Sequence, residues 1–478
     1  MAIRWEDFKE RGQDLLNEFK RQKVGIAGLI IIVTLLMIGI LAPVLAPDVI
    51  GHWEDASRWE NNPRGVPPDW YNYFTSDDYA PSYIETQPSH YNVSNYIRND
   101  RVTHYDWAVI NYTYDFQHDV PPQNLVLHLD GTFDNTSMFR TLNVHVIRPD
   151  GEMVSFSPEA RGGVIDRRMN LIRGNREQIY NWAYGLGVVE EDIPEERIHA
   201  QRTLFGKNDT EILSPNPNPL RGEYTIHITF LSEDIEFNFG EDEGRLVVQG
   251  ATFGWMGTDN RGRDIALGWV WGARYALLLG AIIAGTTISL GTLYGMTSAY
   301  LGGWKDEFMQ RINEIVIGIP ILPILIIMMF IWRQSFWVMV ALMSILYWRG
   351  IAKTIRARGL QIRQSTFVEA AQSLGAGTGR VITTHMIPQI LPYSMAEGAL
   401  LVPIVVITEA SLSVLGLGDP RLVTWGKLLS QAQANQATVQ GLWWWVLLPG
   451  LGITFLGFGF IATGMAIERI VNPKMRQR

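Results

Sequence analysis

The chain has 478 residues, 18% of them charged, and no cysteine, which excludes disulfide frameworks and metal sites built on thiolates. Its net charge of −8 is unevenly distributed: residues 48–256 hold 33 acidic and 16 basic side chains, a net of −17, and the other residues carry +9. An acidic block inside an apolar, basic chain predicts a membrane protein with one large water-soluble insertion.

The N-terminal region predicts a membrane anchor preceded by a short cytoplasmic segment. Residues 1–23 are predicted to form an amphipathic helix on the cytoplasmic side, the alternative being a simple lead into the first span. Val24–Ala42 contains 19 uncharged residues, which is long enough to cross a bilayer, and the first transmembrane helix is placed at 24–47. Three basic residues, Lys20, Arg21 and Lys23, precede it and predict a cytoplasmic N-terminus.

Residues 48–256 are predicted to fold as an extracytoplasmic, mainly-β domain. Alternating apolar and polar residues predict strands at 124–129, 142–147, 224–230 and 245–249. Asp130-Gly131 and Asp150-Gly151 are turn signals, so the strands are expected to form an antiparallel sheet or a β-sandwich. A helix is expected near 177–187, and irregular structure over 51–101. No pair of histidines in the domain has the spacing of metal ligands, so no metal site is predicted.

Five more apolar segments follow the insertion, at about 272–300, 312–332, 336–353, 390–417 and 442–467. With the first span they predict an all-α membrane domain of six transmembrane helices, spans two to six lying within 257–471. Pro320 and Pro323 are expected to interrupt the third span. Lys and Arg gather in the loops that this arrangement assigns to the cytoplasm, together with the tail at 472–478.

The loop at 354–389 is predicted to be a cytoplasmic coupling loop made of two short helices. Thr366–Leu374 is expected to be helical with Ser365 or Thr366 as the N-cap, and Arg380–Ile387 to restart a helix. Gly375, Gly377 and Gly379 between them break the helix and permit a turn with positive φ. Two helices at an angle would fit a groove on a partner. The alternative is an ordinary loop with a glycine-rich turn.

Two acidic residues, Glu397 and Glu409, lie within the fifth predicted span. Intramembrane carboxylates are costly and usually face protein or water. Twelve residues separate them, which places them on different helix faces. One is expected to line a translocation path and the other to pack against a neighbouring helix, with exposure at the interface as the alternative for Glu409.

Four stretches carry a family resemblance. Glu369-Ala370-Ala371, with Gly375 six positions after the Glu and Ile387-Pro388 closing the next helix, resembles the EAA loop of ABC importer permeases. The others are Gly257-Thr258-Asp259-Asn260-Arg261-Gly262-Arg263-Asp264, Glu409–Gly418 and Thr424-Trp425-Gly426. Together they resemble the "C" permease subunit of dipeptide, oligopeptide and nickel importers.

The resemblance implies the permease subunit of a type I ABC importer that takes up peptides or a similar solute. The implied partners are a homologous second permease, two cytoplasmic ATPases, an extracytoplasmic substrate-binding protein and lipid, with no nucleic acid. The chain itself would bind no cofactor and would not be an enzyme, because ATP and Mg are used by the ATPases. The residues implied to contact an ATPase are Glu369, Ala370, Ala371, Leu374, Gly375, Ala376, Arg380 and Pro388.

Two departures from the family pattern stand out. The tail, Thr463–Pro473, lacks most of the family's acidic residues, and the long insertion replaces a short loop. The insertion is hypothesised to dock the substrate-binding protein or to cap the outer mouth. Alternative functions are the import of oligosaccharides or nickel by the same architecture and, more remotely, a membrane-anchored ligand sensor or docking scaffold. A transporter that works alone is disfavoured, because it would not need a surface for an ATPase.

Overall fold

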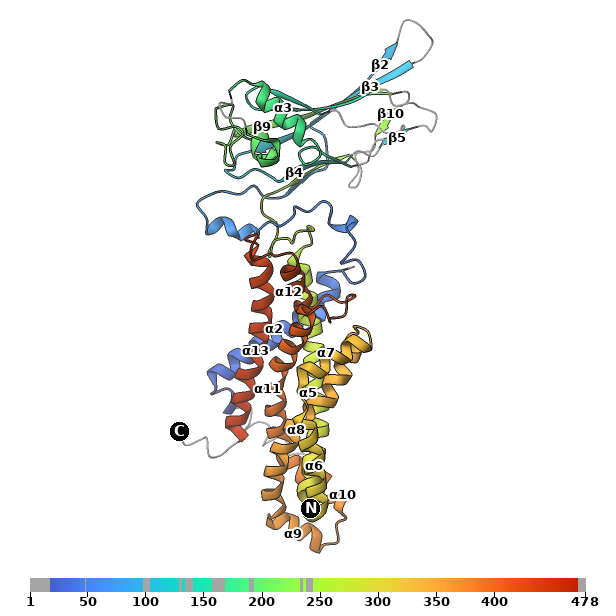
Figure 1. Cartoon of the computed structure of the whole chain (residues 1–478), viewed down its shortest axis with the longest axis vertical. Helices are drawn as coiled ribbons and strands as arrows, with labels where there is room; N and C mark the ends of the chain where they lie inside the picture. The colour runs from blue at the N-terminus through green and yellow to red at the C-terminus, as the bar shows by residue number, and fades with distance from the viewer. Residues whose placement is uncertain are drawn as a thin grey trace. The chain divides into compact units, whose positions relative to one another are not determined.

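The computed structural model describes residues 18–47, 49–97, 104–128, 131–133, 141–156, 168–188, 193–232, 235–237 and 244–471. The chain divides into a helical unit, Met1–Glu54 with Ile265–Arg478, and a β-rich unit, Asp55–Asp264. Figure 1 shows both units. Most of the predicted N-terminal amphipathic helix and the whole of the tail at 472–478 lie outside the described residues.

The helical unit contains the apolar helices that the sequence predicts. Its helices are α2 (Lys23–Leu45), α5 (Ile265–Leu301), α6 (Gly303–Gly318), α7 (Ile321–Ile331), α8 (Phe336–Arg363), α9 (Thr366–Ser373), α10 (Thr378–Arg380), the π-helical η4 (Val381–Met386), α11 (Ile387–Val414), α12 (Trp425–Ala434) and α13 (Trp443–Val471). Among the described residues, five helical stretches are long and apolar enough to cross a membrane, and the α6–α7 pair would make a sixth.

The third predicted span is broken. Helices α6 and α7 meet at Ile319–Pro320 with a bend of 73°. Proline lacks an N–H and its ring collides with the preceding turn, so Pro320 ends one helix and begins the next. Pro323 lies in the first turn of α7, where the missing N–H costs no helical hydrogen bond. The interruption expected from the prolines is confirmed, and the segment at 312–332 is two helices.

Helix α5 lies at the centre of the helical unit and contacts α2, α8 and α11, while α13 packs on α2 and α11. Gly291 and Gly295 let α5 approach α8 closely. A Cβ at Gly295 would lie 2.5 Å from the Ala352 carbonyl oxygen. A Cβ at Gly285, on the same helix, would meet nothing within 4 Å. Small residues therefore set the α5–α8 distance at 291 and 295, and not at 285.

The β-rich unit is built from antiparallel sheets. Its strands are β1 (Tyr83–Glu85), β2 (His90–Ile97), β3 (His104–Phe116), β4 (Asn124–His128), β5 (Gly131–Phe133), β6 (Thr141–Ile147), β7 (Met153–Phe156), β8 (Arg168–Asn170), β9 (Gly222–Ser232), β10 (Ile235–Phe237) and β11 (Arg245–Gln249). The sheets have the orders β2-β3-β9-β6-β7, β1-β11-β4-β8 and β10-β5. The helices are α3 (Arg176–Gly185) and α4 (Ala200–Leu204), with 3₁₀ turns η1 (Ser57–Trp59), η2 (Asp69–Tyr73) and η3 (Glu195–Arg197).

One apolar core joins the two larger sheets. Alternate residues of β3, such as Ile110 and Tyr112, pack with Leu125 of β4 and Leu246 of β11, and α3 adds Ile179. Alternation with a period of two places these side chains on one face of each strand. The four strands expected from alternation are all present, and so is the helix near 177–187. The unit is the sandwich form of the β fold that the sequence predicts.

Two regions differ from expectation. Residues 51–101, expected to be irregular, include strands β1 and β2, each at the edge of a sheet. The segment 257–264, grouped with the membrane domain from its sequence, lies in the β-rich unit. There Asp259 accepts hydrogen bonds from the backbone amides of Arg261 and Arg263 and pairs with the Arg263 side chain at 2.5 Å. This segment is a buried, charge-paired turn.

Candidate coupling surface

Helix α9 begins after Ser365, which has the extended backbone of an N-cap residue. The Ser365 side chain makes no capping hydrogen bond, so the predicted position of the cap is correct and its side-chain role is not seen. Glu369 lies in the first turn, where the helix dipole favours a negative charge. The helix ends at Ser373, one residue before the predicted end.

One face of α9 is anchored in the helical unit. Val368 and Ala371 are buried in an apolar cluster that also contains Met296 of α5, Ile355 of α8 and Met386 of η4. Burying a valine side chain contributes about 1.5 kcal/mol. The cluster draws on α5, α8 and the run into α11, so α9 is packed against three long helices at once.

The opposite face of α9 is exposed and partly apolar. Phe367 is 40% exposed and Leu374 is 88% exposed, and both Glu369 and Ala370 are exposed as well. Positions 367, 370 and 374 follow the i, i+3, i+7 spacing of one helix stripe. The exposed leucine lies on the same stripe as the small Ala370, and Glu369 is exposed as well, so another surface can approach closely. We call residues 367, 369, 370 and 374 the α9 ridge.

A tight turn ends α9 at Gly375. The Gly375 N–H donates to Gln372 O at 2.9 Å, and the Ala376 N–H donates to Ala371 O at 3.0 Å. This is the Schellman pattern, which requires a left-handed residue, and Gly375 has φ +79°. Gly377 has φ −66°, so the positive φ expected of the glycines is confirmed at Gly375 but wrong for Gly377. Ala376 is half-buried against the anchoring cluster.

The second arm of the loop is a continuous helical run. It starts at Thr378 in α10, widens into the π-helical η4 and continues as α11. Arg380 and Pro388 are exposed on this arm. The predicted restart at Arg380 is therefore two residues late. Pro388 is the second residue of α11, and it donates no N–H to the π-helical turn of η4 before it.

Sequence reasoning missed an ion pair that braces the helices leading to α9. Arg356 of α8 holds the Asp306 carboxylate of α6 with two bonds, of 2.7 Å from Nε and 2.5 Å from Nη2. Ser298 of α5 also donates to Asp306. The bidentate geometry makes this a strong, directional contact. Fifty positions separate the two partners, so no local spacing could have revealed it.

The two intramembrane glutamates have different surroundings. Glu397 is half-buried and accepts a hydrogen bond of 2.5 Å from Tyr393, whose ring lies under the guanidinium of Arg358 at 3.5 Å. Glu409 is buried, 5% exposed, and accepts from Ser413 and Thr424, each at 2.8 Å. Glu409 therefore packs inside the unit, as expected of one member of the pair, and is not exposed at an interface.

Thr424, which bonds Glu409, also caps α12 by accepting the Lys427 amide at 3.1 Å. Next to it, Trp425 is buried against Gly272 of α5 and Gly452 of α13 and donates to Trp269 O at 2.9 Å. Residues of α5, α12 and α13, far apart in the sequence, thus meet around one tryptophan. Figure 1 shows α12 at one end of the helical unit and α9 at the other.

Comparison with known proteins places the chain. Residues 288–477 match the family described as the inner membrane component of binding-protein-dependent transport systems. Residues 11–58 match the N-terminal transmembrane domain of oligopeptide transport permease C. The oligopeptide permease OppC of Bacillus subtilis is 33% identical over 225 residues, which is 47% of this chain and 72% of the relative. The chain belongs to this permease family.

Other permeases are similarly related. The dipeptide permease DppC of Bacillus subtilis is 30% identical over 224 residues, 47% of this chain and 69% of the relative. The OppC permease of Haemophilus influenzae is 32% identical over 257 residues, 52% of this chain and 81% of the relative. The resemblance drawn from the sequence is confirmed, and the chain is a multi-pass permease subunit that works with other transporter subunits.

Proposed function

We propose that this permease is the C-type subunit of an ATP-driven importer of di- and oligopeptides. The names of its relatives, oligopeptide and dipeptide permeases, support the substrate class. The proposed partners are a homologous permease, two ABC ATPases that use ATP and Mg, and a substrate-binding protein that delivers the peptide. In this proposal the chain crosses the membrane six times, with the bent α6–α7 pair as the third span.

The proposed orientation places α9 and both termini in the cytoplasm and the β-rich unit outside the cell. Support comes from the basic residues near α9, which obey the preference of Lys and Arg for cytoplasmic loops. These residues are Lys353, Arg356, Arg358, Arg363 and Arg380. The α12 end of the helical unit, with the buried Glu409, then faces outward, and Glu397 lies nearer the cytoplasm and is proposed to line the path.

The α9 ridge is the observation that carries the proposal. Its apolar stripe is exposed while the other face of the same helix is fixed in a core that touches three long helices. We propose that the ridge enters a groove of an ATPase, so that ATP-driven closure of the ATPases tilts α5, α8 and α11. Glu369, Ala370, Leu374, Arg380 and Pro388 would contact the ATPase, whereas Ala371, Gly375 and Ala376 would hold the shape of the loop.

Substitutions on the ridge test this mechanism. Leu374→Asp and Glu369→Lys change exposed side chains, so the permease should fold normally and keep its unfolding temperature. The amount of copurified ATPase and the rate of uptake should both fall at least about tenfold, a change within the range that typical coupling free energies produce. Normal copurification with normal uptake in both variants would contradict the proposal.

A pair of proline substitutions tests the turn itself. Gly375→Pro cannot adopt φ +79° and removes a donated hydrogen bond, so uptake should be lost. Gly377→Pro is the matched control, because φ −66° at this position suits the proline ring. Similar uptake in the two variants would show that the turn geometry does not matter.

A further inference from the structure

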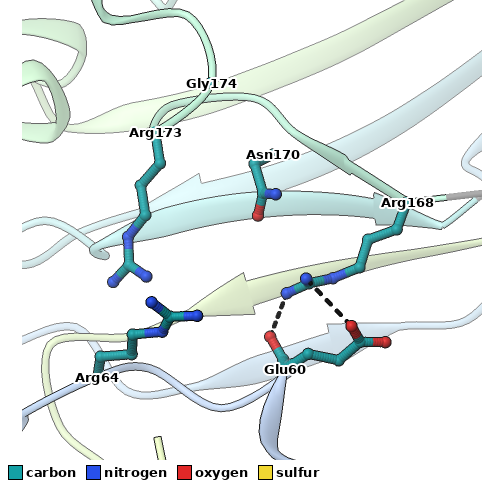
Figure 2. A pocket seen from close by; sticks show the side chains of 6 residues that line it. All are labelled: Glu60, Arg64, Arg168, Asn170, Arg173 and Gly174. Atoms are coloured by element: carbon teal, nitrogen blue, oxygen red, sulfur yellow. Dashed lines mark hydrogen bonds and ion pairs between the residues drawn. The ribbon is translucent and has the colours of Figure 1, made fainter. Parts of the chain in front are cut away.

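A cavity of about 270 Å³ in the β-rich unit has a concentration of positive charge. It is lined by Glu60, Arg64, Arg168, Asn170, Arg173 and Gly174. Figure 2 shows the Arg64 and Arg173 guanidinium groups pointing toward one another across this space, with Arg168 beside them. Three arginines and one carboxylate are unexpected in a region whose net charge is −17.

The three arginines come from separate parts of the fold. Arg168 begins β8 and Arg173 lies in the turn that follows this strand. Arg64 comes from the segment before β1, and its backbone amide is bound to Gln123 Oε1 at 3.1 Å. The same oxygen accepts from Arg173 Nη2 at 2.8 Å. One glutamine thus holds the segments that carry Arg64 and Arg173 together.

The cavity has less negative charge than positive charge. Arg168 is matched by Glu60, with Nη1 3.2 Å from Oε2, and it also donates to the Glu60 carbonyl oxygen. The Arg173 side chain donates to a neutral amide, that of Gln123. Within the described part of the chain, neither Arg64 nor Arg173 forms an ion pair with a carboxylate.

Two facing guanidinium groups repel one another unless a counter-charge lies between them. Burial, and then the positive charges of Arg64 and Arg168, lower the pKa of Arg173. Arginine nevertheless stays protonated in proteins. Both guanidinium groups therefore stay charged, and an anion that enters the cavity gains from both charges.

We propose that this cavity binds a small oxyanion, a carboxylate or a phosphate group, between Arg64 and Arg173. Each guanidinium has a planar fork of donors that matches two oxygens of such a group. The Arg168–Glu60 pair forms the adjacent wall, and the Glu60 carboxylate limits how strongly Arg168 contributes. The site lies outside the coupling surface and does not depend on the proposed transport function.

The test is calorimetric titration of the full-length permease, purified in a neutral detergent, with inorganic phosphate and with acetate. The wild type should bind at least one of them saturably. Arg64→Gln and Arg173→Gln should weaken that binding at least about tenfold, the loss of one charged hydrogen-bonding partner. Arg197→Gln, the same change at an exposed arginine of η3 outside the cavity, should bind like the wild type.

A variant that should bind the oxyanion more tightly distinguishes loss of the site from misfolding of a variant. Glu60→Gln removes the internal carboxylate while keeping the backbone carbonyl that Arg168 bonds, so oxyanion affinity should rise about three- to tenfold. A misfolded variant could not produce that rise. Absence of saturable binding in the wild type, or equal binding in all variants, would overturn the proposal.

A further titration identifies the source of the oxyanion. A short-chain phosphatidic acid carries the same phosphate on an acylated glycerol. If it displaces inorganic phosphate, the site accepts lipid headgroups. If phosphate binding is unchanged, the site takes free anions. Both results require that the oxyanion binds in this cavity. Neither is expected if the Arg173→Gln variant binds phosphate as tightly as the wild type does.

Discussion

His128, at the end of β4, is a titratable residue held by the fold in its neutral form. Its Nε2 lies 2.7 Å from Asn61 Oδ1, and it is partly buried. Burial, and then the charges of Arg245 and Arg168, lower the pKa of His128 to about 4. An unfolded histidine titrates near 6.5.

This depressed pKa predicts a pH-dependent stability of the β-rich unit. Below about pH 6.5 the imidazole binds a proton in the unfolded chain, whereas in the folded chain it stays neutral down to about pH 4. The free energy of unfolding therefore falls between pH 6.5 and pH 4 and levels off below pH 4. The loss attributable to His128 should be about 2 kcal/mol, allowing for partial exposure. The measurement is urea unfolding of the full-length protein at several pH values.

His128→Gln keeps a side-chain donor for Asn61 but does not titrate. The variant should therefore lose less stability between pH 6.5 and pH 4 than the wild type, while acidic residues affect both proteins alike. Parallel pH profiles for the two proteins would contradict the assigned role of His128.

Predictions for single residues succeeded where the backbone conformation restricts which residue type can be present. A glycine six positions after Glu369 predicts a left-handed turn, and Gly375 provides it, because few other residues tolerate positive φ. Partners distant in sequence were not predictable. The Asp306–Arg356 pair and the bonds from Ser413 and Thr424 to Glu409 depend on how the helices pack.

At the scale of elements, the contact between α5 and α8 depends on backbone approach at two glycines. A Cβ at Gly291 would lie 2.9 Å from the Trp348 carbonyl oxygen, and one at Gly295 would lie 3.0 Å from the Arg356 amide nitrogen. Neither neighbour can rotate away, because both are main-chain atoms. The α8 segment involved also carries the arginine that braces α6.

Gly295→Ile should therefore separate α5 from α8 and destabilise the permease by about 3 kcal/mol, the upper range for overpacking. Gly285→Ile is the matched control on the same helix, where the added atoms meet open space within this chain. Thermal unfolding of the isolated permease in detergent would measure both. Equal unfolding temperatures would show that α8 adjusts freely.

Elements with a regular period were predicted well. Strands β4, β6, β9 and β11 were found from alternation, and the break before α7 was found from Pro320. Strand β2 was missed because its polar, Asn-rich sequence packs at a sheet edge, where little apolar burial is needed. Trp444 and Trp445, at the start of α13, are buried, 5% and 0% exposed.

At the scale of the whole molecule, the helical unit holds both ends of the insertion by its own contacts. Trp53 lies against Gly268 of α5, and its indole donates to Gln431 of α12 at 3.4 Å. Glu54 pairs with Lys427 at 3.0 Å. The chain thus leaves the helical unit and returns to it at neighbouring points, so a short linker can replace residues 55–264.

Deleting residues 55–264 should leave a helical unit that still copurifies with its ATPases. If the insertion docks the substrate-binding protein, affinity for that protein should fall at least about tenfold and uptake should fall with it. Binding assays on membranes and an uptake assay check both. Unchanged affinity and uptake would exclude docking and capping of the mouth alike.

The division into an apolar and an acidic part could be predicted from composition, because the acidic residues concentrate in 48–256 and the long uncharged stretches lie outside it. The arginine cavity could not be predicted from the sequence, since Gln123 brings Arg64 and Arg173 together from segments that share no motif.

The π-helical η4 has a consequence for how α9 is aimed. A π turn accommodates one extra residue in a helix that otherwise advances by about 100° per residue. Deleting a single residue from Val381–Met386 would restore the α-helical repeat. It would rotate α9 and α10 about the α11 axis by about 100°. The direction in which α9 faces is thus set by one surplus residue in the helical run that joins it to α11.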